Sequence, residues 1–306
     1  MRVGTAVITG GHPLKTISIS RARLAAGVLG LTLLASPAMA QGMTGSSATP
    51  ITAEVSSPRL YVIDCGQLIY NRPESYGLTR DEVANSNMSV ACFVVVHPNG
   101  VLLYDTGLSD ALVGRPFYEN PQAGYQTLKT STLVGKLADI GLKPADITYL
   151  ALSHSHWDHV GNANLFARST WLTSRAGYDG MFRVPNPPAY DHFDKLKDAK
   201  KIIFEGDHDV FGDGSVILKQ TPGHMPGHQS LYVKLAQTGG VLVAGDLYHY
   251  QEELDKGRMP PEELKSETPR SRQAMETFVR DTHSQIWIPH SIAFFAAARQ
   301  SPAWYE

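Results

Sequence analysis

Three histidines and an aspartate lie within six consecutive positions of this chain, between His154 and His159. The segment reads His-Ser-His-Trp-Asp-His and is separated by Ser153 from an apolar run, residues 147–152. Imidazole nitrogens and carboxylate oxygens suit Zn²⁺ and similar divalent metals. His154 and His156 can point the same way from an extended turn, and Asp158, where the turn enters a helix, can face a second ion together with His159. The segment therefore predicts a metal site at the end of a strand.

Other apolar runs end in the same way. The residues that follow three later runs are His224, Asp246 and His290. An earlier run, residues 101–104, leads into Asp105. Because α/β proteins place their sites at the carboxyl ends of strands, we expect these side chains to converge at one edge of a sheet.

From Arg59 onward, short β-rich runs alternate with helical patterns, which is typical of an α/β fold. We expect helices over residues 132–140, 174–182, 191–197 and 272–279. The chain shows no internal repeat and no sign of a second domain. The sequence therefore predicts one domain over residues 59–306, long enough to bury a full core.

In this order, the motifs resemble those of the metallo-β-lactamase superfamily: an early Asp, His-x-His-x-Asp-His, a His after Thr-Pro-Gly, an Asp and a last His. The resemblance implies an αββα metallo-β-lactamase sandwich with two divalent metal ions, most commonly Zn²⁺. The implied ligands are His154, His156 and His224 for one ion, Asp158, His159 and His290 for the other, and Asp246 between them. Asp105 is expected to orient a ligand histidine, and His228 to be an element of the fold.

Several stretches, including residues 64–66, 161–164 and 221–230, are similar to the N-acyl homoserine lactonase branch. This resemblance implies that a hydroxide bridging two metal ions opens a lactone ring. Asp158 would then also pass a proton to the leaving alkoxide.

Some lactonases carry a tyrosine three residues after the bridging aspartate. In this chain that position is His249, between Tyr248 and Tyr250. The expected catalytic residues are therefore Asp158, His249 and Tyr248, and any of the three side chains at 248–250 could assist at the oxyanion.

The same ligand set suits other reactions. A secreted organophosphate or other ester hydrolase is the main enzyme alternative, since two metal ions also suit phosphotriesters. A mononuclear iron oxygenase would need only His154, His224 and Asp246. A glutathione-thioester hydrolase is disfavoured because no basic cluster for glutathione is evident. Outside the enzymes, the alternative is a non-catalytic periplasmic binding protein, which would not need seven ligands.

Three loops, residues 108–129, 181–190 and 248–261, are expected to wall the substrate pocket. The first carries Phe117, Tyr118 and Tyr125, and Trp157 lies inside the ligand motif. Aromatic and proline side chains fit an apolar ligand. The alternative is that these aromatics only pack their own loops.

The first 40 residues have the pattern of a secretory signal peptide. Two arginines precede an apolar stretch that is too short for a membrane span, and Ala-Met-Ala precedes Gln41. Residues 41–58, rich in Gly, Ser, Thr and Pro, are expected to be a flexible linker. We therefore expect a periplasmic or secreted protein without stable membrane insertion.

Loss of residues 1–40 would remove four of 27 basic residues and none of 29 acidic ones, leaving a net charge of −6. This balance argues against nucleic acid as a partner. It favours a small uncharged or apolar lactone or ester as substrate. A homodimer is also compatible with this charge.

Two cysteines, Cys65 and Cys92, each lie in a strand-like run. An oxidising compartment permits a disulfide, but two buried thiols packed as small apolar side chains are equally compatible with the sequence.

Overall fold

The computed structural model describes residues 55–70, 72–116 and 124–306, which belong to one compact unit. The expected signal peptide, residues 41–54 of the expected linker, and Phe117 and Tyr118 lie outside the described residues. No helix in the described part of the chain is long and apolar enough to cross a membrane.

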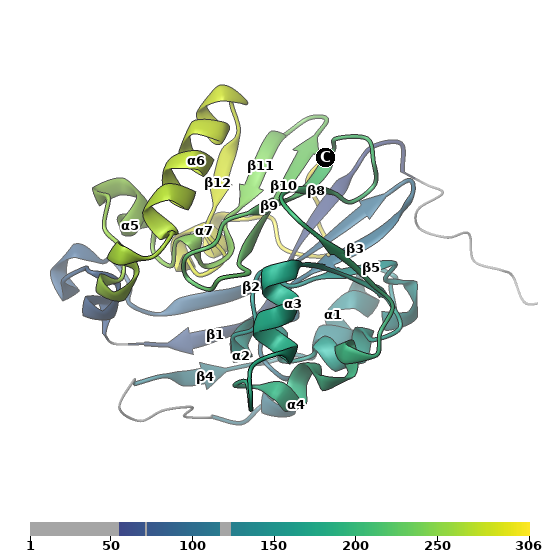
Figure 1. Ribbon diagram of the computed structural model, residues 1–306, viewed down its shortest axis with the longest axis horizontal. Coiled ribbons are helices and arrows are strands. Elements are labelled where there is room, and N and C mark those ends of the chain that lie inside the picture. Colours follow the sequence, from purple (N-terminus) through teal and green to yellow (C-terminus); the bar gives the residue numbers. More distant parts are fainter. Residues whose placement is uncertain (1–54, 71, 117–123) are drawn as a thin grey trace, which may run out of the picture. The chain divides into compact units, whose positions relative to one another are not determined.

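Two β-sheets form the centre of the fold (Figure 1). The first has the strand order β4-β1-β2-β3-β5-β6-β7. Its strands are β1 Arg59–Ile69, β2 Met88–His97, β3 Gly100–Tyr104, β4 Gln126–Leu128, β5 Tyr149–Ala151, β6 Thr170–Ser174 and β7 Lys201–Phe204. The second has the order β12-β11-β10-β9-β8. Its strands are β8 His208–Asp209, β9 Val216–Gln220, β10 Gln229–Leu235, β11 Gly239–Val243 and β12 Gln285–Trp287.

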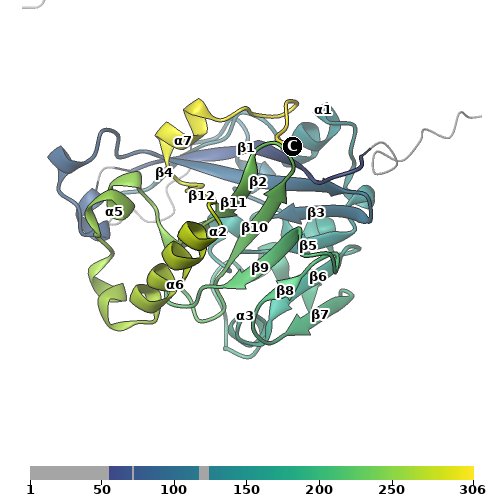
Figure 2. The same ribbon diagram turned by 90° about the horizontal axis from the view of Figure 1, so that it is seen from above.

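Helices cover the outer faces of both sheets, as Figures 1 and 2 show from two directions. The helices are α1 Leu133–Asp139, α2 Trp157–Val160, α3 Arg175–Phe182, α4 Tyr190–Phe193, α5 Gln251–Lys256, α6 Thr268–Asp281 and α7 Ile292–Ala297. α1, α3 and α4 contribute to the core on the seven-stranded sheet, and α6 packs on the five-stranded sheet. The predicted αββα sandwich is therefore confirmed.

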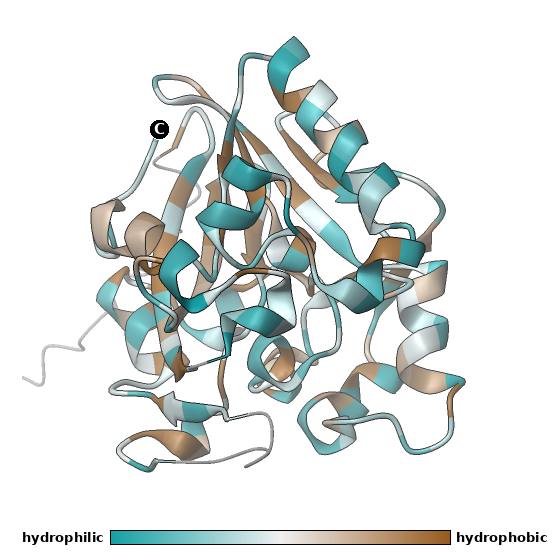
Figure 3. Ribbon diagram, turned by 90° about the vertical axis from the view of Figure 1, so that its left-hand side faces the viewer, coloured by the Kyte–Doolittle hydropathy of each residue, from teal (hydrophilic) through white to brown (hydrophobic). Residues whose placement is uncertain are grey.

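Strand β2 shows why the sheets lie inside the molecule. All ten of its residues, Met-Ser-Val-Ala-Cys-Phe-Val-Val-Val-His, are buried, as expected for a β-branched strand covered on both faces. Val94 packs toward the helices, while Phe93 and Val95 pack between the sheets. This alternation follows the two-residue period of a strand. Figure 3 shows apolar segments on the inner strands and polar segments on the outer helices.

The predicted helices occur close to their expected bounds, with two differences. The helix expected over residues 191–197 is α4 followed by a 3-10 helix, Asp194–Lys197. α6 begins at Thr268, four residues earlier than expected, because Pro269 lies at a first-turn position, where the missing N–H of proline costs nothing. The short 3-10 helix before α6, η9 (Pro261–Lys265), was not expected.

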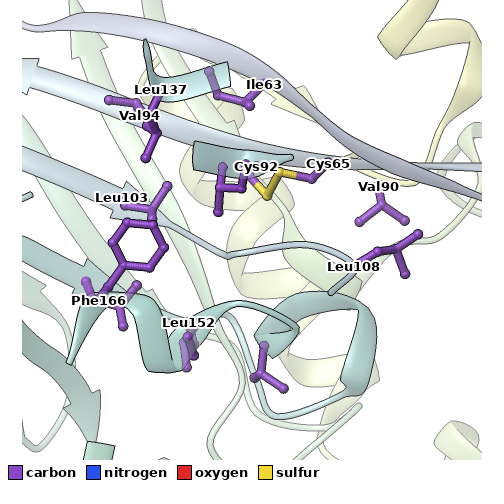
Figure 4. Close-up of a cluster of buried hydrophobic side chains, with 14 of the residues drawn as sticks. Ile63, Cys65, Val90, Cys92, Val94, Leu103, Leu108, Leu137, Leu152 and Phe166 are labelled. Atoms are coloured by element: carbon purple, nitrogen blue, oxygen red, sulfur yellow. A yellow bond between two sulfur atoms is a disulfide. The ribbon is translucent and has the colours of Figure 1, made fainter. Parts of the chain in front are cut away.

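Cys65 and Cys92 form a disulfide between β1 and β2, with their Cα atoms 5.8 Å apart. The bridge lies inside the core, in the same buried cluster as Ile63, Val94 and Leu137 (Figure 4). Of the two states that the sequence left open, the structure has the disulfide.

Candidate metal centre and active site

The predicted ligands lie where several strands end. Asp105 follows β3, and residues 154–159 follow β5, its parallel neighbour. His224 comes four residues after β9, while Asp246 and His290 each come three residues after β11 and β12, which are also parallel. Parallel pairing brings the ends of neighbouring strands to the same edge.

Seven side chains form two groups that could each hold a metal ion among the described residues. The ligand atoms of each group lie within 4.8 Å of one another. The groups are His154, His156, His224 and Asp246, and Asp158, His159 and His290.

In the first group, three ring nitrogens and a carboxylate oxygen face a common centre. His156 Nδ1 lies 2.8 Å from His154 Nε2 and 3.0 Å from His224 Nε2. Asp246 Oδ2 lies 3.6 Å and 3.4 Å from the same two Nε2 atoms. Burial and the neighbouring ring of His224 lower the pKa of His156 to about 4. Its imidazole is therefore neutral at pH 7, as a metal ligand must be.

The second group has the same pattern. His159 Nε2 and His290 Nε2 lie 3.3 Å apart. Asp158 Oδ2 lies 3.7 Å from the first nitrogen and 3.6 Å from the second. The other carboxylate oxygen of Asp246, Oδ1, lies 3.1 Å from His159 Nε2 and 3.2 Å from His290 Nε2.

The surroundings of Asp246 Oδ1 show whether these residues fit a metal ion. This oxygen is buried and accepts no hydrogen bond, although two ring nitrogens lie close to it. A buried carboxylate oxygen without a donor is costly, and a cation between the nitrogens and the oxygen removes that cost. The residues therefore fit a metal ion at each group, with one oxygen of Asp246 facing each.

The far nitrogens of two ligand rings, those of His224 and His290, are held by other groups, which fixes the ring orientations. His290 Nδ1 lies 2.7 Å from the backbone carbonyl of Ser89. His224 Nδ1 lies 2.8 Å from Glu263 Oε1. In both residues Nε2 is the nitrogen left to face the metal.

Asp105 orients a ligand and belongs to neither group. Its Oδ2 lies 2.9 Å from His159 Nδ1, and its Oδ1 accepts a 2.6 Å hydrogen bond from the backbone N–H of Ser153. Asp105 has φ 62°, in the left-handed region that few non-glycine residues adopt. Backbone strain of this kind is found where a functional geometry requires it.

His228 belongs to the fold beneath the site. Its Nε2 accepts a 2.9 Å hydrogen bond from the backbone N–H of Asp246, and its Nδ1 lies 2.8 Å from Thr221 Oγ1. Gly245, at φ 60°, allows this approach, because a Cβ there would lie 2.7 Å from His228 Nε2. His228 thus positions Asp246 through the backbone.

His249 lies beside the two groups. It is buried, with Nε2 3.3 Å from Asp246 Oδ2 and Nδ1 3.5 Å from Glu253 Oε1. Burial lowers the pKa of His249, but the carboxylates of Asp246 and Glu253 outweigh that effect and raise the pKa to about 10. His249 lies beside the candidate ligands, where the sequence predicted a catalytic side chain.

Tyr248 is not brought to the site, which corrects its assignment as a catalytic residue. Its hydroxyl donates to Glu276 in α6, and the guanidinium of Arg272 lies 4.2 Å from its ring centroid. Tyr250 donates instead to the backbone carbonyl of Ser86. The extended backbone at Tyr248 directs neighbouring side chains to opposite sides, so only His249 of these three faces the ligands.

A cavity of about 630 Å³ opens onto the two groups, within the usual range for small-molecule sites. Its floor includes His156, Asp158, Asp246, His249 and His290. The other lining residues include Leu68, Met88, Tyr70, Tyr76, Tyr125 and Trp157.

Three tyrosines and Trp157 form the aromatic wall of this cavity. Tyr70 stacks on Tyr125 at 4.4 Å, and Tyr125 meets Trp157 edge-on at 6.4 Å. The hydroxyls of Tyr76 and Tyr125 lie 2.7 Å apart, and the ring of Tyr76 lies 4.4 Å from that of His249. The wall thus joins an apolar surface to hydroxyls near the metal ligands.

Each of the three predicted loops contributes to the lining, through Tyr125, Pro188 and Pro260. Trp157 lines the cavity as predicted. The other two predicted pocket residues, Phe117 and Tyr118, fall outside the described residues.

A model of the metallo-beta-lactamase superfamily matches residues 86–281 of the chain, a region that holds every predicted ligand except His290. The chain belongs to this superfamily. Within the superfamily, it is 30% identical over 203 residues to the N-acyl homoserine lactonase of Bacillus cereus, which covers 64% of this chain and 78% of the relative. It is 25% identical over 263 residues to the N-acyl homoserine lactonase AttM of Azorhizobium caulinodans, covering 81% of this chain and 98% of the relative.

Solved structures agree with this placement. A variant of AiiA from B. thuringiensis, with N-decanoyl-L-homoserine bound at the active site, is 27% identical with a TM-score of 0.69 and covers 82% of this chain and 100% of its own. An N-acyl homoserine lactone hydrolase with its product N-hexanoyl-L-homoserine at the catalytic metal centre is 26% identical, with the same coverage and TM-score. The resemblance to the lactonase branch is confirmed, and this member of the superfamily is a metal-dependent ester hydrolase.

The sequence did not reveal several residues of the site. Tyr70 and Tyr76 follow β1, outside the three predicted loops. Glu253 and Glu263 lie among other acidic residues of a polar segment. Their burial, at 0% and 5% exposed, distinguishes them from their neighbours, and burial is decided by packing.

Proposed function

We propose that this protein opens the ring of N-acyl homoserine lactones at two divalent metal ions, in the periplasm or outside the cell. The observation that carries the proposal is the cavity with an aromatic wall that opens onto two ligand groups, both faced by Asp246. The imidazole-rich ligand set suits Zn²⁺. The named relatives are lactonases, and the cavity accommodates an uncharged ring with an apolar tail.

Two bound divalent ions would acidify a shared water toward a pKa of about 7 and polarise the lactone carbonyl. The chain's own residues do the rest. Asp246 holds both ligand groups in register, with one oxygen toward each. Asp158 lines the cavity and can carry a proton to the alkoxide that leaves when the ring opens.

His249 supplies a hydrogen-bond donor beside the reacting carbonyl. Its Nε2 faces the ligand groups, and Glu253 lies behind Nδ1. With a proton on Nε2, the ring can stabilise negative charge that develops on the carbonyl oxygen. The role of Tyr248 is structural in this proposal.

The aromatic wall would take the acyl tail. Tyr70, Tyr125, Trp157 and Met88 offer apolar surface, and each buried CH₂ contributes roughly 0.8 kcal/mol, or about fourfold in kcat/KM. We therefore expect kcat/KM to rise with acyl length until the cavity is full.

Two features support export. The N-terminal 40 residues have the pattern of a signal peptide. The Cys65–Cys92 disulfide is of the kind that persists in oxidising compartments.

The test is a substrate panel of lactones of graded acyl length, methyl paraoxon and a β-lactam, on protein of measured metal content. His154→Ala should abolish turnover of every lactone. Tyr125→Ala should flatten the rise with acyl length and spare short lactones, because it removes tail contacts and leaves the ligands in place. The proposal fails if methyl paraoxon or the β-lactam is turned over far faster than any lactone.

A further inference from the structure

Glu263, on η9, is a buried carboxylate that contacts the candidate metal ligand His224, which lies 39 residues earlier in the chain. Its Oε1 lies 2.8 Å from His224 Nδ1, and its Oε2 accepts a 2.7 Å hydrogen bond from Thr268 Oγ1. Its neighbour Glu262 is exposed. Both oxygens of Glu263 are therefore committed to partners inside the protein.

Burying this charge needs a compensating positive charge. Among the described residues, the ion-pair partner of Glu263 is His224 alone, with no lysine or arginine. His224 Nε2 faces the first ligand group, so a metal ion bound there would supply the positive charge.

The second ligand group provides an internal comparison. There Asp105 Oδ2 lies 2.9 Å from His159 Nδ1. The other far nitrogen in that group, on His290, meets a neutral backbone carbonyl. Each group thus has a histidine backed by a carboxylate, Glu263 for the first and Asp105 for the second.

The turn that carries His224 is locked to the segment that carries Glu263. Gly223, at φ 146°, packs so closely on the start of α6 that a Cβ there would lie 2.2 Å from the backbone nitrogen of Thr268. Ser271 Oγ donates a 2.6 Å hydrogen bond to the carbonyl of Pro222. These contacts, together with the hydrogen bond from Thr268 to Glu263, hold Glu263 next to His224.

We propose that Glu263 is a positioning residue for the first metal ion. It fixes the His224 ring with Nε2 toward the ion and, through its charge, makes His224 a stronger ligand. The inference rests on the metal centre of the proposed function and not on the lactone substrate.

Glu263→Gln tests the charge while keeping the side-chain shape and an oxygen for His224. We expect the affinity for one of two Zn²⁺ ions, measured by chelator competition, to fall roughly 10–100-fold, with the other ion unchanged. In a Co²⁺ titration of this variant, the visible absorption bands of one site should then appear only at a higher Co²⁺ concentration than in the parent protein. Asp105→Asn should weaken the other site, and Glu262→Gln should weaken neither.

Thr268→Val, which removes the hydroxyl on Glu263 Oε2, should give a smaller loss at the same site as Glu263→Gln. Wild-type affinity for both ions in folded Glu263→Gln, or in Thr268→Val if the first variant does not fold, would overturn the proposal. Selective loss of one ion in a protein that turns over no lactone would support this inference and refute the proposed substrate.

Discussion

Asp246 is the residue on which both ligand groups depend. Oδ2 faces the nitrogens of His154 and His224, and Oδ1 faces those of His159 and His290. Burial raises the pKa of Asp246, but the surrounding imidazoles outweigh burial and hold that pKa well below its usual value. A single side chain therefore links the two groups.

Asp246→Ala should accordingly lose most of both metal ions, because each group loses an oxygen and the charge that balances it. Elemental analysis should give near two equivalents per chain for the parent. One equivalent, unchanged in the variant, would instead indicate a single-metal site.

His228 should make folding stability sensitive to acid. Burial, and then the nearby charge of His224, lower the pKa of His228 from 6.5 to about 3. The folded pKa lies below the unfolded one, so this contribution is complete above pH 6.5 and is lost as the pH falls toward 3. Protonation would also remove the lone pair that accepts from the N–H of Asp246.

Urea unfolding between pH 7 and 4 should therefore show a shallower acid loss in His228→Gln than in the parent. The difference in slope should be up to about 1.4 kcal/mol per pH unit, the value for one proton. Parallel curves would show that His228 does not titrate with folding.

At the scale of elements, the disulfide ties β1 to β2 close to the loop that positions a ligand. Gly107, two residues after Asp105, packs against both sulfurs, since a Cβ there would lie 3.0 Å from each. The backbone N–H of Thr106 also bonds to the carbonyl of His159. Strand pairing, disulfide and ligand loop thus form one packed unit.

Removing the disulfide should cost about 2–4 kcal/mol of unfolding free energy, since the bridge closes a loop with a sequence separation of 27. Urea midpoints with and without reductant measure this. A Cys65→Ala/Cys92→Ala double variant serves as control and should not respond to reductant. Equal midpoints for the parent under both conditions would contradict the expectation.

For the whole molecule, the N-terminal segment concerns location. Exported protein should begin near Gln41, and intact-mass analysis should show a loss of about 4 kDa, from the length of the signal peptide. Full-length chain recovered only from the cytoplasm would refute export.

The candidate metal ligands and the fold class could both be predicted from the sequence. The candidate ligands at residues 154–159 are local in the chain, and His224, Asp246 and His290 each follow a recognisable apolar run, so their spacing and order were sufficient to predict that they would come together. The α/β alternation depends on the same local periodicities, and most predicted helices occur near their expected bounds.

The surroundings of those candidate ligands could not be predicted, because they depend on how distant segments pack together. Whether His249 or Tyr248 faces the site depends on the backbone after Asp246, and the choice of Glu263 rather than Glu262 depends on how η9 packs against the turn before His224. The disulfide and the meeting of Tyr76 with Tyr125 likewise join segments far apart in the chain. Such contacts arise from packing between elements, and a local pattern does not encode which surfaces of those elements will meet.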